Sequence, residues 1–127
     1  MAKKEFTYRG LTFDAIKKMN IKEFAALIPS RERRTLLRGF TEPEKSLLRK
    51  LEKRSNVKTQ VREMVIVPQM VGKTVLVHTG KEYVPVNVTE EMLGFRIGEF
   101  TLTRKPLKHS TPGVGATASS KGGPAVK

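Results

Sequence analysis

Three turns in the middle of the chain combine a glycine with a cation, and this combination suits the binding of phosphate. Glycine lets the backbone approach a phosphate closely, lysine supplies a point charge, and arginine supplies a planar fork of donors. Three such turns within 127 residues favour contacts with the phosphate backbone of a nucleic acid. The turns are Gly72-Lys73, Gly80-Lys81, and the segment from Gly94 to Gly98 that contains Arg96.

The letters GKT, which begin at Gly72, also end the nucleotide-binding P-loop, but the rest of that motif is missing. The full pattern requires a glycine where this chain has Val67, and a helix where the run VLV indicates a strand. Nothing in the sequence supplies a nucleophile and an orienting group for His78 or His109, and cysteine is absent. We therefore predict a protein that is not an enzyme and that needs no cofactor or metal.

The charge of the chain points to a polyanionic partner. Twenty-five Lys and Arg residues against twelve Asp and Glu residues leave a net charge of +13. Residues 1–60 hold sixteen basic and seven acidic side chains, residues 61–102 hold four and five, and residues 103–127 hold five and none. A near-neutral centre between two basic flanks indicates a folded core with arms that reach for an anion, nucleic acid before an anionic membrane. A merely soluble basic protein is the less favoured alternative.

The first sixty residues are predicted to form short helices. Asn20 with Glu23, and Thr41 with Glu44, have the spacing of a capping box at a helix start. No apolar run is long enough to span a bilayer, and the N-terminus lacks the apolar core of a signal peptide. We therefore expect a soluble intracellular protein without a membrane-spanning segment.

One predicted helix carries a stripe of arginines. Ser30 is predicted to cap the helix RERRTLLR, which Gly39 would end. A stripe that binds an anion and an ordinary solvated face are about equally favoured for its cations, because only one glutamate offsets four arginines. The stripe consists of Arg31, Arg34 and Arg38, and the next helix has a basic side with Arg49, Lys50, Lys53 and Arg54.

The centre of the chain changes to strand character. The runs VREMVIVP, KTVLVH and KEYVPVNV predict three strands, and Thr79-Gly80 predicts a hairpin turn between the last two. Pro85 lacks an amide donor, so its strand lies at an edge or the proline faces away from the ladder. We predict an α+β fold with a basic helical part (1–60), a core with a small three-stranded sheet and a helical turn (61–104), and a disordered basic tail (105–127).

The sequence around the second glycine-lysine pair resembles a known family. The run from Ile66 to Arg104 resembles the S-nineteen family of small-subunit ribosomal proteins, called S-fifteen in eukaryotes, and the similarity is close over residues 60–110. The N-terminal letters YRG and PSRERRTLLRG resemble the longer archaeal and eukaryotic branch. Phe95 departs from the histidine that many members have. The shared pattern is Gly80-Lys81, Val88, Leu93-Gly94, Gly98-Glu99-Phe100 and Thr103.

This resemblance implies a small three-stranded sheet with helices packed on it, in a structural constituent of the small ribosomal subunit. It further implies a place in the subunit head, bound to rRNA near the decoding region and beside the neighbouring protein S-thirteen. The tail would approach tRNA, and the protein would be found in the cytoplasm, on the ribosome. The alternative is a general basic nucleic-acid-binding protein outside the ribosome.

The candidate RNA contacts combine the turns, the arginine stripe and the tail. An RNP-like aromatic pattern and a GXXG loop are absent, so recognition of the shape and backbone of folded RNA fits better than base stacking on a sheet. Around the core the predicted contacts are Arg62, Gly72, Lys73, Gly80, Lys81, Gly94, Arg96, Gly98, Arg104 and Lys105. Those of the helix are Arg31, Arg33, Arg34 and Arg38, with contact to a protein neighbour as the alternative for that helix. Those of the tail are Lys108, His109 and Lys121.

Overall fold

The computed structural model describes residues 5–106, and it confirms the predicted α+β fold. Lys108, His109 and Lys121, with the rest of the predicted tail from residue 107 on, lie outside the described residues. No helix among residues 5–106 is long and apolar enough to cross a membrane. The elements are β1 (Thr7–Tyr8), β2 (Leu11–Thr12), α1 (Phe13–Lys18), α2 (Ile21–Leu27), α3 (Ser30–Arg38), α4 (Glu42–Lys53), β3 (Asn56–Thr59), β4 (Thr74–His78), β5 (Tyr83–Asn87), and the 3-10 helices η1 (Pro68–Met70), η2 (Glu90–Met92) and η3 (Ile97–Phe100).

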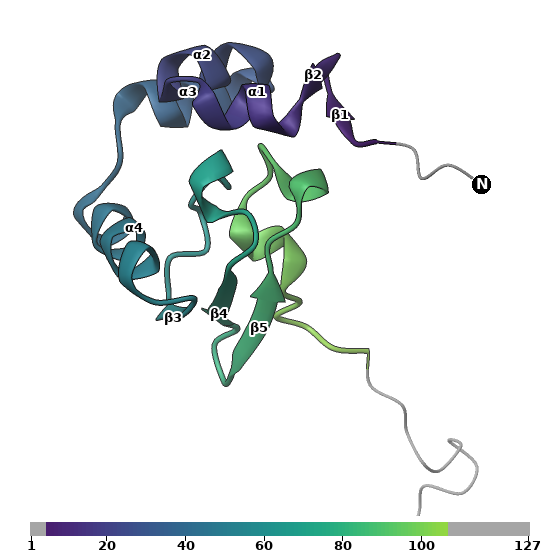
Figure 1. Cartoon of the computed structure of the whole chain (residues 1–127). Helices are drawn as coiled ribbons and strands as arrows, with labels where there is room; N and C mark the ends of the chain where they lie inside the picture. The colour runs from purple at the N-terminus through teal and green to yellow at the C-terminus, as the bar shows by residue number, and fades with distance from the viewer. Residues whose placement is uncertain (1–4, 107–127) are drawn as a thin grey trace, which may run out of the picture.

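The N-terminal elements form a helical layer, which consists of the β1–β2 hairpin and helices α1, α2 and α3 (Figure 1). Both predicted capping boxes are confirmed: Glu23 accepts a hydrogen bond from the Asn20 amide at 3.1 Å, and Glu44 accepts one from the Thr41 amide at 2.7 Å. The predicted cap at Ser30 is wrong by one residue. Helix α3 already includes Ser30, its N-cap is Pro29, and no side chain caps it.

The sheet has the strand order β3-β4-β5, with β3 parallel to β4 and β5 antiparallel to it. The predicted hairpin is confirmed, since His78 pairs with Tyr83 across a four-residue loop in which Gly80 has φ +104°. Pro85 lies on β5, an edge strand, as its missing amide predicts. Figure 1 shows α4 beside this sheet and the helical layer above it.

The third strand differs from the one that the sequence predicts. Residues 56–59 form β3, whereas the run VREMVIVP forms no named strand. Met64, Val65, Ile66 and Val67 of that run are all buried, and their backbone bonds to the segment around η2 and η3. Ile66, for instance, donates to the Phe95 carbonyl at 2.8 Å. The run is rich in β-branched residues because it crosses the core, not because it pairs in a ladder.

One hydrophobic core joins the helical layer to the sheet. Its buried side chains include Ile16, Phe24 and Ile28 of the layer, as well as Val75 and Val77 of β4. The N-terminal helices are therefore packed into the same core as the sheet, and residues on α3 are held at a fixed place relative to the segments that follow β5.

Gly94 lies at a close contact between the two parts. It has φ +80°, and a Cβ at this position would lie 2.9 Å from Ile28 Cγ2 and 2.9 Å from the Tyr8 hydroxyl oxygen. The absence of a side chain at Gly94, predicted to admit a phosphate, thus has a packing role within the fold. Whether Gly94 also contacts RNA stays a prediction.

Substitution of Gly94 by alanine is expected to lower the free energy of unfolding by about 2–3 kcal/mol, because it adds a clash to an unfavourable φ. Gly72→Ala is the matched control, since Gly72 has φ +81° but nothing within 4 Å of an added Cβ. Gly72→Ala should lower the free energy of unfolding only by the backbone strain, about 1 kcal/mol. Urea unfolding of both variants would measure the difference, and equal losses would contradict the steric role of Gly94.

Candidate nucleic-acid interface

Four arginines from two distant segments line one open hollow of about 570 Å³, here called the arginine hollow. Three of them lie on α3 at the predicted helical spacing, and the fourth comes from the segment between η2 and η3. The sequence predicts the arginine stripe of α3 and Arg96 as separate RNA contacts, and in the structure they line the same hollow. The lining residues are Ser30, Arg31, Arg34, Thr35, Arg38 and Arg96.

Glu32 anchors two of these arginines from beneath. Its side chain is 10% exposed and accepts a hydrogen bond from Arg31 Nε at 2.9 Å, while Arg96 Nε lies 3.7 Å away. Burial alone would raise the pKa of Glu32, but the Arg31 hydrogen bond and the charges of Arg31 and Arg96 outweigh it and hold that pKa below its ordinary value. Arg31 also lies 3.9 Å from a Glu99 carboxylate oxygen. Four guanidinium groups against the two carboxylates of Glu32 and Glu99 leave the hollow positive.

The donors of the hollow are largely available to a ligand. Among the hydrogen bonds and ion pairs of residues 5–106, none involves the side chain of Arg34 or Arg38. Arg96 Nε is buried and has no hydrogen-bond partner in the described part of the chain. Its nearest acceptor is the Glu32 carboxylate, and the Arg96 side chain as a whole is 24% exposed, so a charged acceptor in the hollow would bind the exposed part of this guanidinium. Arginine forks of this kind match the geometry of phosphate oxygens.

Arg62, also predicted to contact phosphate, uses its guanidinium inside the fold. It donates to the His78 carbonyl at 2.8 Å, the Gly98 carbonyl at 2.9 Å, and both oxygens of Thr101, Oγ1 at 2.8 Å and the carbonyl at 2.7 Å. A Cβ at Gly98 would lie 2.9 Å from the Arg62 carbonyl oxygen. The missing side chain of Gly98 therefore lets its backbone approach that of Arg62, and the Gly98 amide donates to the same carbonyl at 2.9 Å. RNA contacts by Arg62 and Gly98 stay predictions.

Arg33 likewise bonds to backbone within the helical layer. Its guanidinium donates to the carbonyls of Ala25, Ala26 and Ile28 at 3.0–3.1 Å. These carbonyls lie at the end of α2, where the helix itself supplies no donors. Arg33 therefore fixes α2 against α3 and turns away from the stripe that its neighbours form.

The sequence of the chain matches a family model over residues 34–109, and the family is described as Ribosomal protein S19. The matched segment is more than half of the chain. The chain belongs to the ribosomal protein S-nineteen family. The family predicted from residues 66–104 is thereby confirmed, and with it a small-subunit ribosomal protein. Arg34, Arg38 and Arg96 lie inside the matched segment, whereas Arg31 precedes it.

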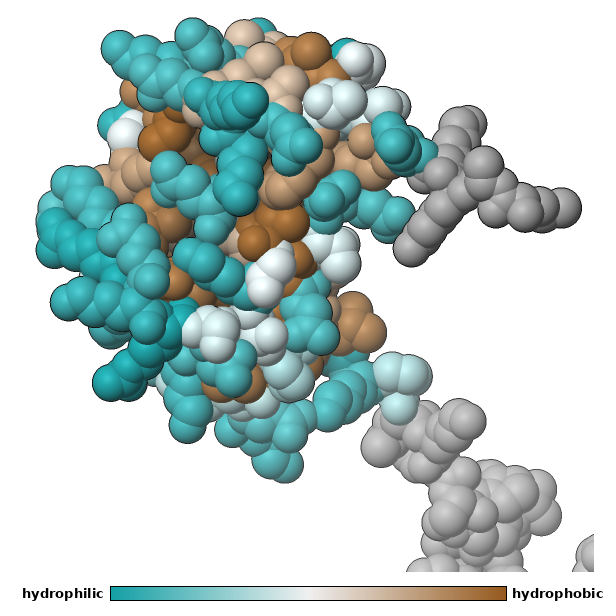
Figure 2. Space-filling model, in the orientation of Figure 1, coloured by the Kyte–Doolittle hydropathy of each residue, from teal (hydrophilic) through white to brown (hydrophobic). Residues whose placement is uncertain are grey.

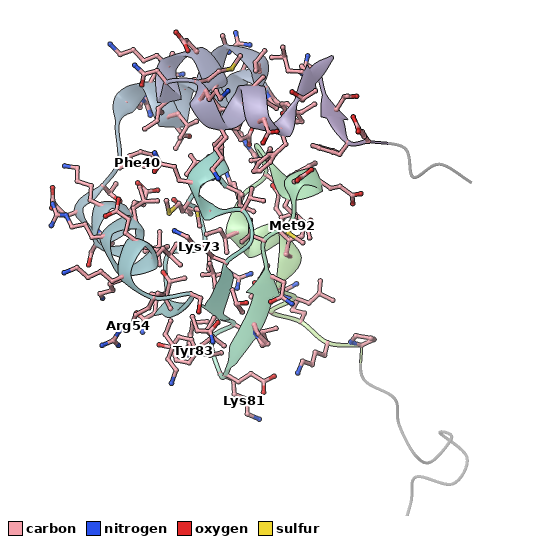
Figure 3. All side chains as sticks on the ribbon, in the orientation of Figure 1. Phe40, Arg54, Lys73, Lys81, Tyr83 and Met92 are labelled. Carbon is pink, nitrogen blue, oxygen red and sulfur yellow. The ribbon has the colours of Figure 1, made fainter. Side chains whose placement is uncertain are left out.

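The remaining predicted contacts of this S-nineteen protein lie away from the arginine hollow. Lys81 is exposed at the tip of the β4–β5 hairpin, and Lys73 is half-buried at the other end of β4 (Figure 3). Gly72 and Gly80 have positive φ and open space at the Cβ position, but their amides already donate, to the Val88 carbonyl at 2.9 Å and to His78 Nδ1 at 3.1 Å. Arg104 is exposed. Which of them contact RNA stays a prediction.

Lys105 pairs with a carboxylate on the hairpin loop. Its Nζ lies 2.5 Å from Glu82 Oε1. This hydrogen bond, with the charges of Lys105 and Lys81, holds the pKa of Glu82 below its ordinary value. The pair connects the end of the described chain to the hairpin. Lys105, which the sequence predicts to contact RNA, is thus already paired with a carboxylate within the fold.

A second basic surface includes residues that the list of predicted contacts omits. Lys50 and Lys53 of α4, Arg54 directly after it and Lys58 of β3 line an open hollow of about 590 Å³. Lys58 Nζ lies 5.4 Å from the centre of the Tyr83 ring. Hydrophilic side chains cover the outer face of α4 in Figure 2, and in Figure 3 Arg54 lies at the lower end of α4, with Tyr83 on the neighbouring hairpin. The basic side of α4 is visible in the sequence, but the position of Lys58 requires the strand register.

The charge of Glu32 should make stability depend on pH. Because its pKa is lowered on folding, the carboxylate stabilises the fold above the unfolded pKa, and this contribution disappears as the pH falls through the folded value. Glu32→Gln should therefore lower the free energy of unfolding at pH 7, by about 1–2 kcal/mol, and should flatten its decline from about pH 5 to pH 3.

Glu42→Gln is the control for this prediction. Glu42 also has a lowered pKa, caused by its hydrogen bond to Lys45, but its side chain is 78% exposed. Salt screens such an exposed pair, so Glu42→Gln should barely change the free energy of unfolding in moderate salt. Urea unfolding at several pH values compares the two variants, and parallel curves for Glu32→Gln and the unchanged protein would contradict the anchoring role of Glu32.

Proposed function

We propose that this protein binds rRNA in the head of the small subunit, near the decoding region, and that the arginine hollow holds phosphates of the RNA backbone. The observation that carries this proposal is the convergence of four arginines above one buried carboxylate, with the side chains of Arg34 and Arg38 in no hydrogen bond or ion pair among residues 5–106. The net charge of +13 and the membership in a ribosomal family support an RNA ligand over other polyanions.

The finer partners follow from the same proposal. The protein would lie beside S-thirteen in the subunit head, with its tail directed toward tRNA. An archaeal or eukaryotic type of member is supported by the letters YRG and PSRERRTLLRG, which resemble that longer branch of the family.

Binding measurements on folded RNA and duplex DNA test this function. The full chain is titrated with fragments of small-subunit rRNA and with duplex DNA of equal length, at low and at raised salt. We expect a preference for the rRNA fragments that persists at raised salt, where non-specific phosphate contacts weaken. Equal affinity for both nucleic acids at raised salt would replace this function with general nucleic-acid binding. Sedimentation of the native protein with small subunits in a gradient provides an independent check.

A further inference from the structure

A smaller hollow of about 340 Å³, here called the Phe95 pocket, adjoins the arginine hollow. It forms where the β1–β2 turn and the residue before α3 meet the segment between η2 and η3. Its walls belong partly to the N-terminal segment outside the family match and partly to the matched core. The lining residues on which the inference depends are Tyr8, Arg9, Pro29, Leu93, Phe95 and Glu99.

Two carboxylates connect the Phe95 pocket to the arginine hollow. Glu32 also lines the pocket, while its carboxylate pairs with Arg31 and Arg96 of the hollow. Glu99 lines the pocket and lies 3.9 Å from Arg31. Phe95 and Arg96 are consecutive, so one backbone segment serves both hollows. A nucleotide whose phosphate is bound by Arg31 and Arg96 would therefore have its base next to the Phe95 pocket.

The pocket combines a flat apolar wall with a polar edge. The Phe95 side chain is 49% exposed although it is large and apolar, and Phe100 holds its ring in an edge-to-face contact, with centroids 6.0 Å apart and planes at 83°. Pro29, which is exposed, adds apolar surface, and the buried Leu93 lies behind it in the core. Unpaired bases in RNA typically stack on such aromatic rings and hydrogen-bond through their Watson–Crick edge.

The polar edge selects among the bases. Glu99 offers a carboxylate, which when ionised only accepts hydrogen bonds, and its side chain is 43% exposed. Guanine presents two adjacent donors on its Watson–Crick edge, the ring N1–H and the exocyclic amino group, and two such donors match the two oxygens of a carboxylate. Adenine, cytosine and uracil each present a single donor group there.

We propose that the Phe95 pocket binds one unpaired guanine of the RNA whose phosphates the arginine hollow holds, with Phe95 stacking on the base and Glu99 accepting from its Watson–Crick edge. This inference rests on the proposed function and adds base readout to backbone contact. It requires both the N-terminal segment and the family core, since Tyr8, Arg9 and Pro29 precede residue 34.

The test uses three RNA hairpins with the same stem: one fully paired, one with a single bulged guanosine, and one with a single bulged adenosine. Fluorescence anisotropy of labelled hairpins gives their affinities for the full chain at one salt concentration. We expect the guanosine bulge to bind about tenfold more tightly than the paired stem, as stacking on one aromatic ring allows. The adenosine bulge should gain less.

Variants assign the preference to the pocket. Phe95→Leu should abolish the gain for either bulge, and Glu99→Gln should abolish the difference between guanosine and adenosine. Because Glu99 also pairs with Arg31 of the hollow, each bulge is compared with the paired stem bound by the same variant. Leu37→Ala is the matched control, since Leu37 is an exposed apolar residue of α3 that lines neither hollow, and it should change nothing.

The possible failures are distinguishable. Equal affinity of the unchanged protein for the paired and the guanosine-bulged stems would overturn the Phe95 pocket and leave the arginine hollow intact. Equal gains for guanosine and adenosine would overturn the assignment of guanine. If none of the hairpins bound, the proposed function itself would fail.

Discussion

Replacement of Arg62 by alanine is expected to lower the free energy of unfolding by about 3–5 kcal/mol, although Arg62 is a partly exposed cation in a basic protein. The guanidinium joins the end of β4 to η3 and to the residue that follows η3, through four hydrogen bonds to oxygen atoms. Without it, the carbonyls of His78, Gly98 and Thr101 would lose a charged donor, and no other side chain of residues 5–106 donates to them. Charge-assisted bonds of this kind are among the strongest in proteins.

Two further variants separate geometry from charge. Arg62→Lys keeps the positive charge, but one ammonium group cannot reach four acceptors in different directions, so it should recover only a small part of the loss. Arg49→Ala removes the same charge from an exposed position on α4 and should change the free energy of unfolding by less than about 0.5 kcal/mol. Chemical unfolding followed by circular dichroism measures all three. A small loss for Arg62→Ala would favour the RNA contact that the sequence predicts.

Arg62 also shows where sequence reasoning reaches its limit. An arginine before an extended apolar run can bind either a phosphate or several backbone carbonyls, because its guanidinium donates hydrogen bonds to both kinds of acceptor. The choice depends on Gly98 and Thr101, which lie more than thirty residues away and approach Arg62 only after the chain has folded. Arg33 is a similar case, because its acceptors belong to another helix.

Local sequence signals predicted two helix starts and the hairpin turn correctly, but they did not predict which segment pairs as the third strand. The two capping boxes and the hairpin turn depend on residues three or four positions apart, and both features are present. The third strand, β3, has only four residues, whereas the longer run VREMVIVP has the composition of a strand. Its position across the core, with four consecutive buried residues, follows from the packing of η2 and η3 against it.

The candidate site was predictable in its parts but not as a whole. Helical spacing puts Arg31, Arg34 and Arg38 on one side of α3, and the glycine turn nominates Arg96. Their convergence depends on the pairing of Val65 with Arg96 and on the buried Glu32, which sequence alone presents as an ordinary helix residue. The Phe95 pocket requires the same tertiary contact, because its two walls are distant in the sequence.

Removal of three arginines from the hollow should lower the affinity for rRNA fragments about 100-fold near physiological salt, if each contacts one phosphate. The variant combines Arg34→Ala and Arg38→Ala with Arg96→Gln, since glutamine keeps a donor for the buried Glu32. The slope of log affinity against log salt should fall in magnitude by about 2–3, because each lost phosphate contact contributes about 0.7–0.9.

The matched control removes three other exposed charges, Lys17, Lys18 and Lys22, by substitution with alanine. These lysines lie on α1 and α2 and line none of the described hollows, so they act on RNA only through the long-range field, which salt screens. Filter binding across a salt series compares the two variants. Equal losses would show that total charge, and not the geometry of the arginine hollow, governs binding. A loss confined to the hollow variant, with unchanged urea unfolding, would locate the phosphate contacts where α3 meets Arg96.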